Sequence, residues 1–238
     1  MADDERAPSS KDPLPIRDLK FLGGMAAPGG WRPPPVLPEI AFSGRSNVGK
    51  SSLLNRLVRR KAFARVSKTP GRTREINFFE VNGRFVFADL PGYGYAQVSK
   101  ERRAEWRPLI EGYLQSSPSL VGVVQLLDAR RDPTDDDRLM LDFLASLEVP
   151  SLIALTKIDK LGGRAGEQQV QSIIRSLALD PEQVIPFSAT TGLGRDELAE
   201  ALVSLIDEVE RNAPPAPDAP MDDDAPPLAL PHAGEAGE

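Results

Sequence analysis

The chain has 238 residues, of which 40% are hydrophobic, and it contains no cysteine and a single histidine, His232. This composition is typical of one folded domain with tails, and it excludes a disulfide scaffold and any thiol-based metal site or nucleophile. Because His232 lies in a low-complexity stretch, a histidine base is also disfavoured. No run of 18 apolar residues is present, and the first 11 residues lack the apolar stretch of a signal peptide, so we expect a cytoplasmic protein without a membrane span.

The acidic residues gather at the two ends of the chain. Of 35 acidic and 29 basic residues, 213–238 hold six acids and no Lys or Arg, and 1–13 hold four acids and two bases. Residues 14–212 therefore carry 25 acidic and 27 basic residues, so the acidic total does not argue against a nucleic-acid partner. We expect a disordered head (1–13), an N-terminal extension and Pro/Gly-rich loop (14–38), a folded domain (39–212) and a disordered acidic, Pro-rich tail (213–238).

Apolar runs and helical patterns alternate between these ends. Asn82-Gly83 between two apolar runs is a strong hairpin signal. The expected strands are 39–43, 76–81, 84–90, 121–127, 151–155 and 184–187, and the expected helices are 50–60, 102–114, 135–147, 167–177 and 195–211. This order predicts a three-layer α/β fold, with a mostly parallel sheet, one antiparallel edge strand and helices on both faces.

A glycine-rich run between the first expected strand and helix fits the pattern G-x-x-x-x-G-K-[ST]. It consists of Gly44, Arg45, Ser46, Asn47, Val48, Gly49, Lys50 and Ser51. Glycines there let successive backbone N–H groups surround a phosphate, the lysine reaches the β- and γ-phosphates, and the serine hydroxyl contacts Mg²⁺. The strand–loop–helix context favours this phosphate-binding loop over a chance glycine-rich turn.

A second motif, Asp89-Leu90-Pro91-Gly92, ends an expected strand. In P-loop enzymes an acid in this place holds Mg²⁺, often through water, and the glycine senses the γ-phosphate. An ordinary strand-ending turn is the alternative. The position after a hairpin and downstream of the P-loop favours the nucleotide role.

Two further motifs predict the base that is bound. Thr156-Lys157-Ile158-Asp159 fits the pattern [TN]-K-x-D, and its carboxylate can accept hydrogen bonds from N1–H and the 2-amino group of guanine, a pair of donors that adenine lacks. The lysine can lie along the base and contact the P-loop. Phe187-Ser188-Ala189 follows the last expected strand, where a backbone N–H can meet the guanine O6. A charged turn after a strand is the alternative for the first of these motifs.

The loop from Lys68 to Thr73 lies between the first helix and the hairpin, where nucleotide-dependent switches occur. A threonine hydroxyl in such a loop joins Mg²⁺ when the γ-phosphate holds the loop closed. Thr69 and Thr73 both qualify on position alone.

Taken in order, these motifs are those of the translation-factor-like GTPases. More narrowly, the sequence resembles the EngB family of bacterial GTP-binding proteins over about residues 16–210. The resemblance rests on GRSNVGKSSLLN from Gly44, TPGRT from Thr69 and DLPGYGYA from Asp89.

This resemblance implies that residues 39–212 form a Ras-like, GTP-binding G domain that uses Mg²⁺ and hydrolyses GTP. We expect a monomer. It favours Thr73 over Thr69 as the switch ligand of Mg²⁺ beside Ser51, and it extends the nucleotide contacts to Gly71, Arg72, Arg74 and Glu75. It also implies a role in large ribosomal subunit assembly and in normal cell division and septation. A P-loop kinase and a nucleotide-dependent scaffold at the division septum without a ribosomal role are the alternatives.

The expected catalytic residues are Lys50, Thr73 and Asn47. Ras-like enzymes orient the attacking water with a glutamine just after Asp-x-x-Gly, and here that position is Tyr93, so we expect slow intrinsic turnover. In several relatives with a hydrophobic residue there, a P-loop asparagine binds K⁺. Asn47 stands at that position, and we leave open whether it binds K⁺ or only bonds within the loop.

Basic residues suggest a surface for ribosomal RNA. Residues 56–74 hold eight Arg or Lys and no acid. Lys100, Arg102, Arg103 and Arg107 lie among acids and follow the second switch, the segment that begins with Asp89-Leu90-Pro91-Gly92. A solvated helix face is the alternative. Tyr93, Tyr95 and Trp106 can stack on bases, although packing is favoured.

Overall fold

The computed structural model describes residues 12–60, 75–94 and 100–212. Within these ranges seven strands alternate with five α-helices and two short 3₁₀ helices. The strands are β1 (Leu19–Met25), β2 (Glu39–Gly44), β3 (Ile76–Val81), β4 (Phe85–Asp89), β5 (Leu120–Asp128), β6 (Ser151–Thr156) and β7 (Val184–Phe187). The helices are α1 (Lys50–Leu57), α2 (Lys100–Ser116), α3 (Asp135–Ser146), η2 (Ile158–Lys160), α4 (Gly163–Leu177), η3 (Pro181–Gln183) and α5 (Arg195–Asn212).

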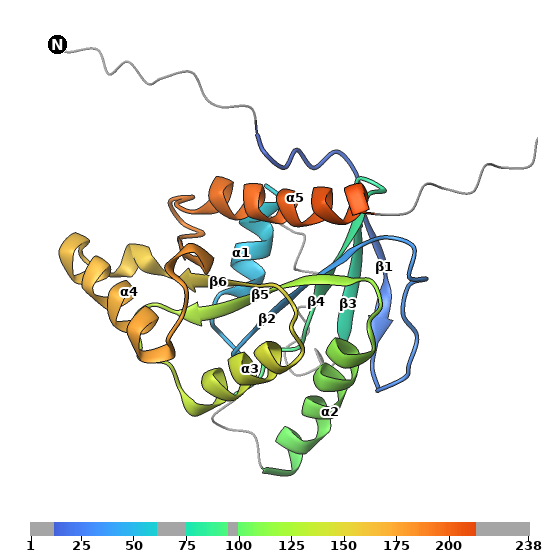
Figure 1. The fold of residues 1–238 in the computed structure, drawn as a ribbon, viewed down its shortest axis with the longest axis horizontal. Coiled ribbons are helices and arrows are strands. Elements are labelled where there is room, and N and C mark those ends of the chain that lie inside the picture. Colours follow the sequence, from blue (N-terminus) through green and yellow to red (C-terminus); the bar gives the residue numbers. More distant parts are fainter. Residues whose placement is uncertain (1–11, 61–74, 95–99, 213–238) are drawn as a thin grey trace, which may run out of the picture.

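The strands form one sheet in the order β1-β3-β4-β2-β5-β6-β7 (Figure 1). Neighbours from β4 to β7 are parallel, whereas β3 runs antiparallel to both β4 and β1. The β3–β4 turn has φ of 54° at Asn82 and 63° at Gly83, and Arg84 N donates to Val81 O at 2.9 Å. These angles are those of the hairpin turn that Asn-Gly predicts. The predicted three-layer, mostly parallel α/β fold is confirmed.

One detail of the predicted sheet is corrected: the antiparallel strand β3 is not at the edge, because β1 covers it. Leu19 lies opposite Val81 and Met25 opposite Ile76. The sequence pattern predicts only an extension and loop over 14–38, since glycines interrupt the apolar run. In the structure, the pairing of β1 with β3 shifts register between Phe21 and Gly23. A Cβ at Gly23, where φ is +152°, would lie 2.6 Å from the Trp31 ring, so glycine lets this ring pack against the strand.

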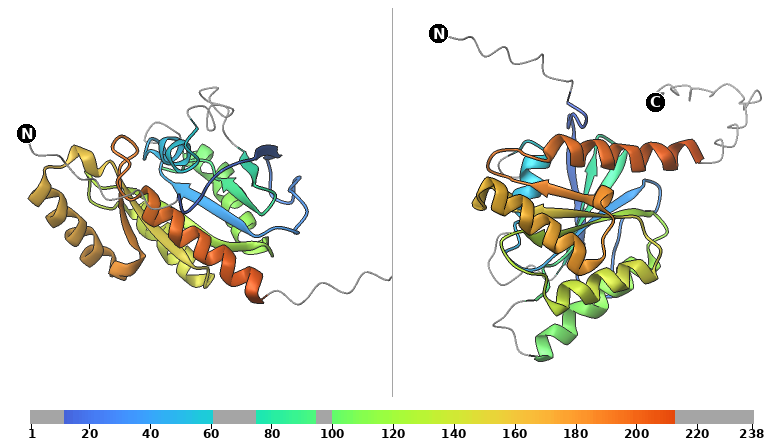
Figure 2. Two further views of the ribbon diagram at one scale, coloured as in Figure 1. Left: turned by 90° about the horizontal axis from the view of Figure 1, so that it is seen from above. Right: turned by 60° about the vertical axis from the view of Figure 1, so that its left-hand side comes forward.

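The helices cover both faces of the sheet, as the predicted alternation requires (Figures 1 and 2). Along β5, Val124 and Leu126 pack with buried residues of α1 and α5. Val123 packs with residues of α2 and α3, and Leu127 with residues of α4. The alternation of side chains in a strand therefore places α1 and α5 on one face and α2, α3 and α4 on the other. None of the helices in the described ranges combines the length and apolarity needed to cross a bilayer.

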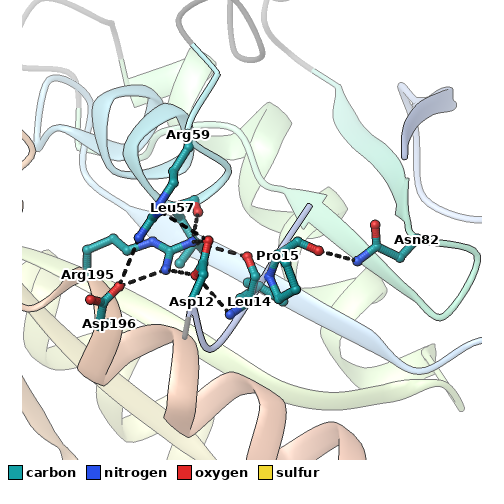
Figure 3. Close-up of polar contacts among 8 residues, drawn as sticks. All are labelled: Asp12, Leu14, Pro15, Leu57, Arg59, Asn82, Arg195 and Asp196. Atoms are coloured by element: carbon teal, nitrogen blue, oxygen red, sulfur yellow. Dashed lines mark hydrogen bonds and ion pairs between the residues drawn. The ribbon is translucent and has the colours of Figure 1, made fainter. Parts of the chain in front are cut away.

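The segment that precedes β1 is tied to the body of the domain by a buried arginine (Figure 3). The Arg195 guanidinium is ion-paired with Asp12 and donates to Leu57 O at 2.8 Å and to Leu14 O at 3.2 Å. At the other end of the segment, the Asn82 side chain donates to Pro15 O at 2.9 Å. Residues 12–18 thus cross from the start of α5, past the end of α1, to the β3–β4 turn.

Candidate nucleotide-binding site

The sequence motifs meet at one edge of the sheet because they follow parallel strands. In the register of the sheet, Asp89 lies opposite Phe42, and Phe42 is two residues before the start of the P-loop. Thr156 lies opposite Phe187. The carboxyl ends of parallel strands form the crevice in which α/β proteins bind ligands. Residues far apart in sequence are thereby brought into one site.

The P-loop joins β2 to α1 with backbone angles that favour anion binding. Asn47 and Gly49 have φ of 64° and 114°, and no side chain caps the start of α1. The uncapped N–H groups of the first turn are therefore available to a phosphate. Glycine is required at the start of the loop, since a Cβ at Gly44 would lie 2.9 Å from Val48 Cγ1 and 3.0 Å from Leu126 Cβ.

Lys50, at the start of α1, forms an ion pair with Asp89 at the end of β4. The two side chains are 11% and 5% exposed. Ser51, the next residue of α1, brings a hydroxyl to the same helix start. Hydroxyl and carboxylate oxygens are ligands that Mg²⁺ prefers, and such sites are usually completed by substrate phosphates. Accordingly, no group of three or more His, Cys, Asp or Glu in the part of the chain that the structure describes could hold a metal alone.

The two motifs that the sequence predicts to bind the base are linked by a hydrogen bond. Ser188 Oγ donates to Asp159 Oδ1 at 2.8 Å, and Lys160 Nζ lies 3.2 Å from Asp159 Oδ2. The hydrogen bond from Ser188 is the main cause that lowers the pKa of Asp159. Ser188 Oγ also accepts from Thr191 N at 3.1 Å. Asp159 is therefore an ionised acceptor that is held in place, as the recognition of two guanine donors requires.

Two residues of the Thr156–Asp159 motif contact the P-loop directly. Thr156 Oγ1 donates to Val48 O at 2.7 Å. Lys157, with φ of 63°, donates to Asn47 O at 2.6 Å and to Asp128 Oδ2 at 2.9 Å. The motif expected to select the base is thus joined directly to the loop expected to hold the phosphates.

Asp128 is a candidate site residue that the sequence motifs did not include. Burial raises its pKa, but hydrogen bonds from Arg130 and Lys157 outweigh this effect and hold the pKa well below its usual value. A cavity of about 450 Å³ adjoins it, lined by Ser46, Asn47, Lys157 and neighbouring residues. The available signal is its position, since Asp128 ends an apolar parallel strand, as Asp89 does.

The residue after Asp-x-x-Gly lies in the core. Tyr93 is 1% exposed, its N donates to Gly44 O at 3.3 Å, and its O accepts from Ser46 N at 2.8 Å. The packing role favoured by the sequence is therefore found for this residue, and its ring is not available for stacking on bases. Tyr95 and the side chain of Trp106 lie outside the described part of the structure.

Part of the predicted site lies outside the described residues, namely Gly71, Arg72, Thr73 and Arg74, together with Thr69. Glu75 is described and directly precedes β3, where a Cβ on Gly24 would be 2.6 Å from Glu75 Oε2. It is thus at the same edge of the sheet as the P-loop, but beside β1.

The described members of the two basic segments make contacts within the chain. Arg59 lies 3.4 Å from Asp12 and 3.5 Å from Asp196, and Arg107 Nε donates to Glu111 Oε1 at 2.5 Å. Arg59 is nevertheless 57% exposed. Residues 61–74, which carry most of the first basic segment, lie outside the described ranges.

A P-loop between β2 and α1, an acid that ends the adjacent strand and a [TN]-K-x-D tetrad that begins at the end of β6 together define the class as a P-loop GTPase. Residues 39–157 match the family model described as 50S ribosome-binding GTPase.

Similar proteins assign the chain to one family within the P-loop GTPases. The chain is 66% identical over 191 residues to the probable GTP-binding protein EngB of Gemmatimonas aurantiaca, covering 80% of this chain and 94% of that protein. It is 50% identical over 185 residues to the probable GTP-binding protein EngB of Geobacter metallireducens, covering 78% and 90%. A crystal structure of a probable GTP-binding protein EngB superposes with a TM-score of 0.61 at 26% identity, covering 71% of this chain and 99% of that one. The chain belongs to the EngB family of GTP-binding proteins.

Proposed function

We propose that this GTPase is a cytoplasmic, monomeric nucleotide switch that assists assembly of the large ribosomal subunit and that normal cell division and septation depend on it. The match of residues 39–157 to the 50S ribosome-binding GTPase model carries the proposal. The geometry supports a single guanine-nucleotide site, because Lys157 and Thr156 connect the expected base-binding motif to the P-loop through Asn47 O and Val48 O. The proposal assigns nucleotide binding to residues 39–212, with 14–38 as an extension that supplies β1.

Mg²⁺ is the ion expected with the nucleotide, as is general for GTPases. Ser51 and, in the closed switch, Thr73 would hold it, with Asp89 acting directly or through water. The ion neutralises charge on the β- and γ-phosphates, and Lys50 contributes a second positive charge. No glutamine amide follows Gly92 to orient a water, so turnover without a partner is slow.

K⁺ is the second ion that we propose, with Asn47 as a ligand. Asn47 is exposed and its left-handed backbone, with φ of 64°, places it on the outer side of the P-loop. Its carbonyl is held by Lys157, which fixes the position of the residue.

Ribosomal RNA of the large subunit is the proposed partner. The basic segment 56–74 adjoins the end of α1 and includes the predicted switch, so a surface there would change with nucleotide state. Contacts through phosphates would weaken steeply with salt.

Co-sedimentation with purified large ribosomal subunits tests this function, with a non-hydrolysable GTP analogue and separately with GDP. The Asp159→Asn variant, which is expected to bind guanine nucleotide poorly, serves as the control. Binding only with the analogue, and loss of binding in the variant, is the expected result. Equal binding in both states would contradict a switch, and absence of binding in both would reject the ribosomal role and make the scaffold at the septum the next hypothesis.

A further inference from the structure

The phenol of Tyr93 is part of a buried polar network that the phosphate-binding and base-binding motifs do not explain. Tyr93 directly follows Gly92, and its hydroxyl donates to Asp137 Oδ1 at 3.0 Å. The amide of Gln125, in β5, donates to the same hydroxyl. Tyr93 and Asp137 are 1% and 5% exposed, so both groups are shielded from water.

Asp137 is itself held rigidly. Its Oδ2 accepts from Thr134 N at 2.9 Å and from Thr134 Oγ1 at 2.7 Å, which completes a capping box at the start of α3. Burial, followed by the nearby charge of Asp137, raises the pKa of Tyr93 well above its usual value. The phenol is therefore a neutral donor at physiological pH, and both carboxylate oxygens have partners.

The backbone beside this ring lies against the P-loop. Hydrogen bonds between Tyr93 and the backbones of Gly44 and Ser46 make an isolated parallel bridge with Arg45. A Cβ on Gly92 would lie 3.0 Å from Ser46 Cα. Gly92 is the glycine of the Asp-x-x-Gly motif, which is expected to sense the γ-phosphate. Its position is therefore set on one side by the P-loop and on the other by the buried ring of Tyr93.

We propose that Tyr93 is a positioning residue for recognition of the γ-phosphate, because its hydroxyl bond to Asp137 fixes Gly92 against the P-loop. The network connects the start of α3 to Gly92, a part of the site that would contact the γ-phosphate and so distinguish GTP from GDP. Loss of the hydroxyl removes the hold on the ring side of Gly92 and leaves the backbone bonds of Tyr93 to the P-loop in place. Gly92 is then positioned less tightly, which weakens contacts to the γ-phosphate and leaves contacts to the base and the β-phosphate intact.

Tyr93→Phe tests this proposal, and Tyr113→Phe is a matched control. Tyr113 is also 1% exposed, and its hydroxyl donates at 2.8 Å to the buried carboxylate of Glu39, at the opposite end of β2 from the P-loop. Each substitution removes one phenol hydroxyl from one buried carboxylate. Only the first lies beside Gly92.

The measurement is the affinity of each full-length variant for GDP and for a non-hydrolysable GTP analogue, with Mg²⁺, by titration of a fluorescent nucleotide. For Tyr93→Phe we expect the preference for the analogue over GDP to fall by about tenfold, with GDP affinity unchanged. For Tyr113→Phe we expect no change in this ratio. An unchanged ratio in Tyr93→Phe, or an equal loss for both nucleotides, would overturn the proposal and leave Tyr93 a purely structural role.

Thr134→Ala is the second variant if Tyr93→Phe does not fold. It removes the hydroxyl that holds Asp137 without altering the tyrosine, and Thr134 is only half-buried. The ratio should shift in the same direction, and Thr134→Ser should restore it. A ratio equal to that of the unaltered protein in Thr134→Ala would again refute the positioning role.

Discussion

Replacement of Arg195 by alanine should destabilise the domain far more than replacement of an exposed arginine that contacts the same acids. Arg195 is 4% exposed, and its guanidinium joins the segment before β1, the end of α1 and the start of α5 (Figure 3). It donates to the carbonyls of Leu57 and Leu14 and pairs with Asp12 and Asp196. The substitution therefore removes contacts to three separate parts of the chain at once.

The magnitude follows from the burial of each partner. Leu57 and Leu14 are 0% and 3% exposed, and a buried carbonyl that loses its donor costs about 1–3 kcal/mol. The Asp12 and Asp196 side chains are 22% and 54% exposed, so they regain water and contribute less than about 1 kcal/mol each. Arg195 Nε is buried without a hydrogen-bond partner among the described residues, and the substitution relieves that cost. We expect a net loss of about 3 kcal/mol in the free energy of unfolding.

Urea denaturation of Arg195→Ala and Arg59→Ala measures the difference. Arg59 lies 3.4 Å from Asp12 and 3.5 Å from Asp196, but it is 57% exposed, so its loss should cost less than about 1 kcal/mol. The reasoning fails if the two variants lose the same free energy of unfolding, because burial of the guanidinium would then be irrelevant.

Three further predictions concern titration, base selection and ions. Burial raises the pKa of Asp12, but contacts with Arg195 and the Leu14 N–H outweigh it and lower the pKa below its usual 3.8. The stability that Asp12 contributes is therefore present above about pH 3.8 and lost as the pH falls through the lower pKa of the folded state. Asp12→Asn should flatten this part of the profile of urea midpoint against pH, and an unchanged slope would contradict the prediction. Asp159→Asn should lower GTP affinity by about one to two orders of magnitude in calorimetry and improve binding of xanthosine triphosphate, whose second carbonyl suits an amide donor; undiminished GTP binding would exclude Asp159 from base recognition. GTP hydrolysis should be severalfold faster in KCl than in NaCl, and Asn47→Ala should remove the difference, whereas equal rates in both salts would reject Asn47 as a K⁺ ligand.

The elements that the sequence predicts well are those governed by local rules. Asn82-Gly83 predicts the hairpin because both residues adopt positive φ at low cost, and φ values of 54° and 63° are found. The further role of Asn82 has no such signal. Its side chain holds the backbone of Pro15 and Arg17, about 65 residues earlier, and such pairing depends on the completed fold.

Strand β1 is a second feature that local sequence rules do not predict. Gly23 and Gly24 lower the intrinsic preference for a strand, so the local pattern favours a loop. The strand forms because it can pair with the edge of β3. The glycine at position 23 leaves the space that the Trp31 ring occupies. Tertiary pairing therefore overrides the local preference.

The network around Tyr93 combines a local rule with a long-range consequence. Asp135, Asp136 and Asp137 look alike in sequence, as three acids that favour the start of a helix through its dipole. Asp135 is exposed and Asp136 half-buried, whereas Asp137 is 5% exposed, because the third helical position reaches back to Thr134 in the capping box. That inward turn brings one carboxylate to the hydroxyl of Tyr93. The capping box that starts α3 thus also places a hydrogen-bond acceptor at the Tyr93 hydroxyl, next to Gly92. For this reason a substitution at Thr134 should alter nucleotide preference although Thr134 does not contact the nucleotide.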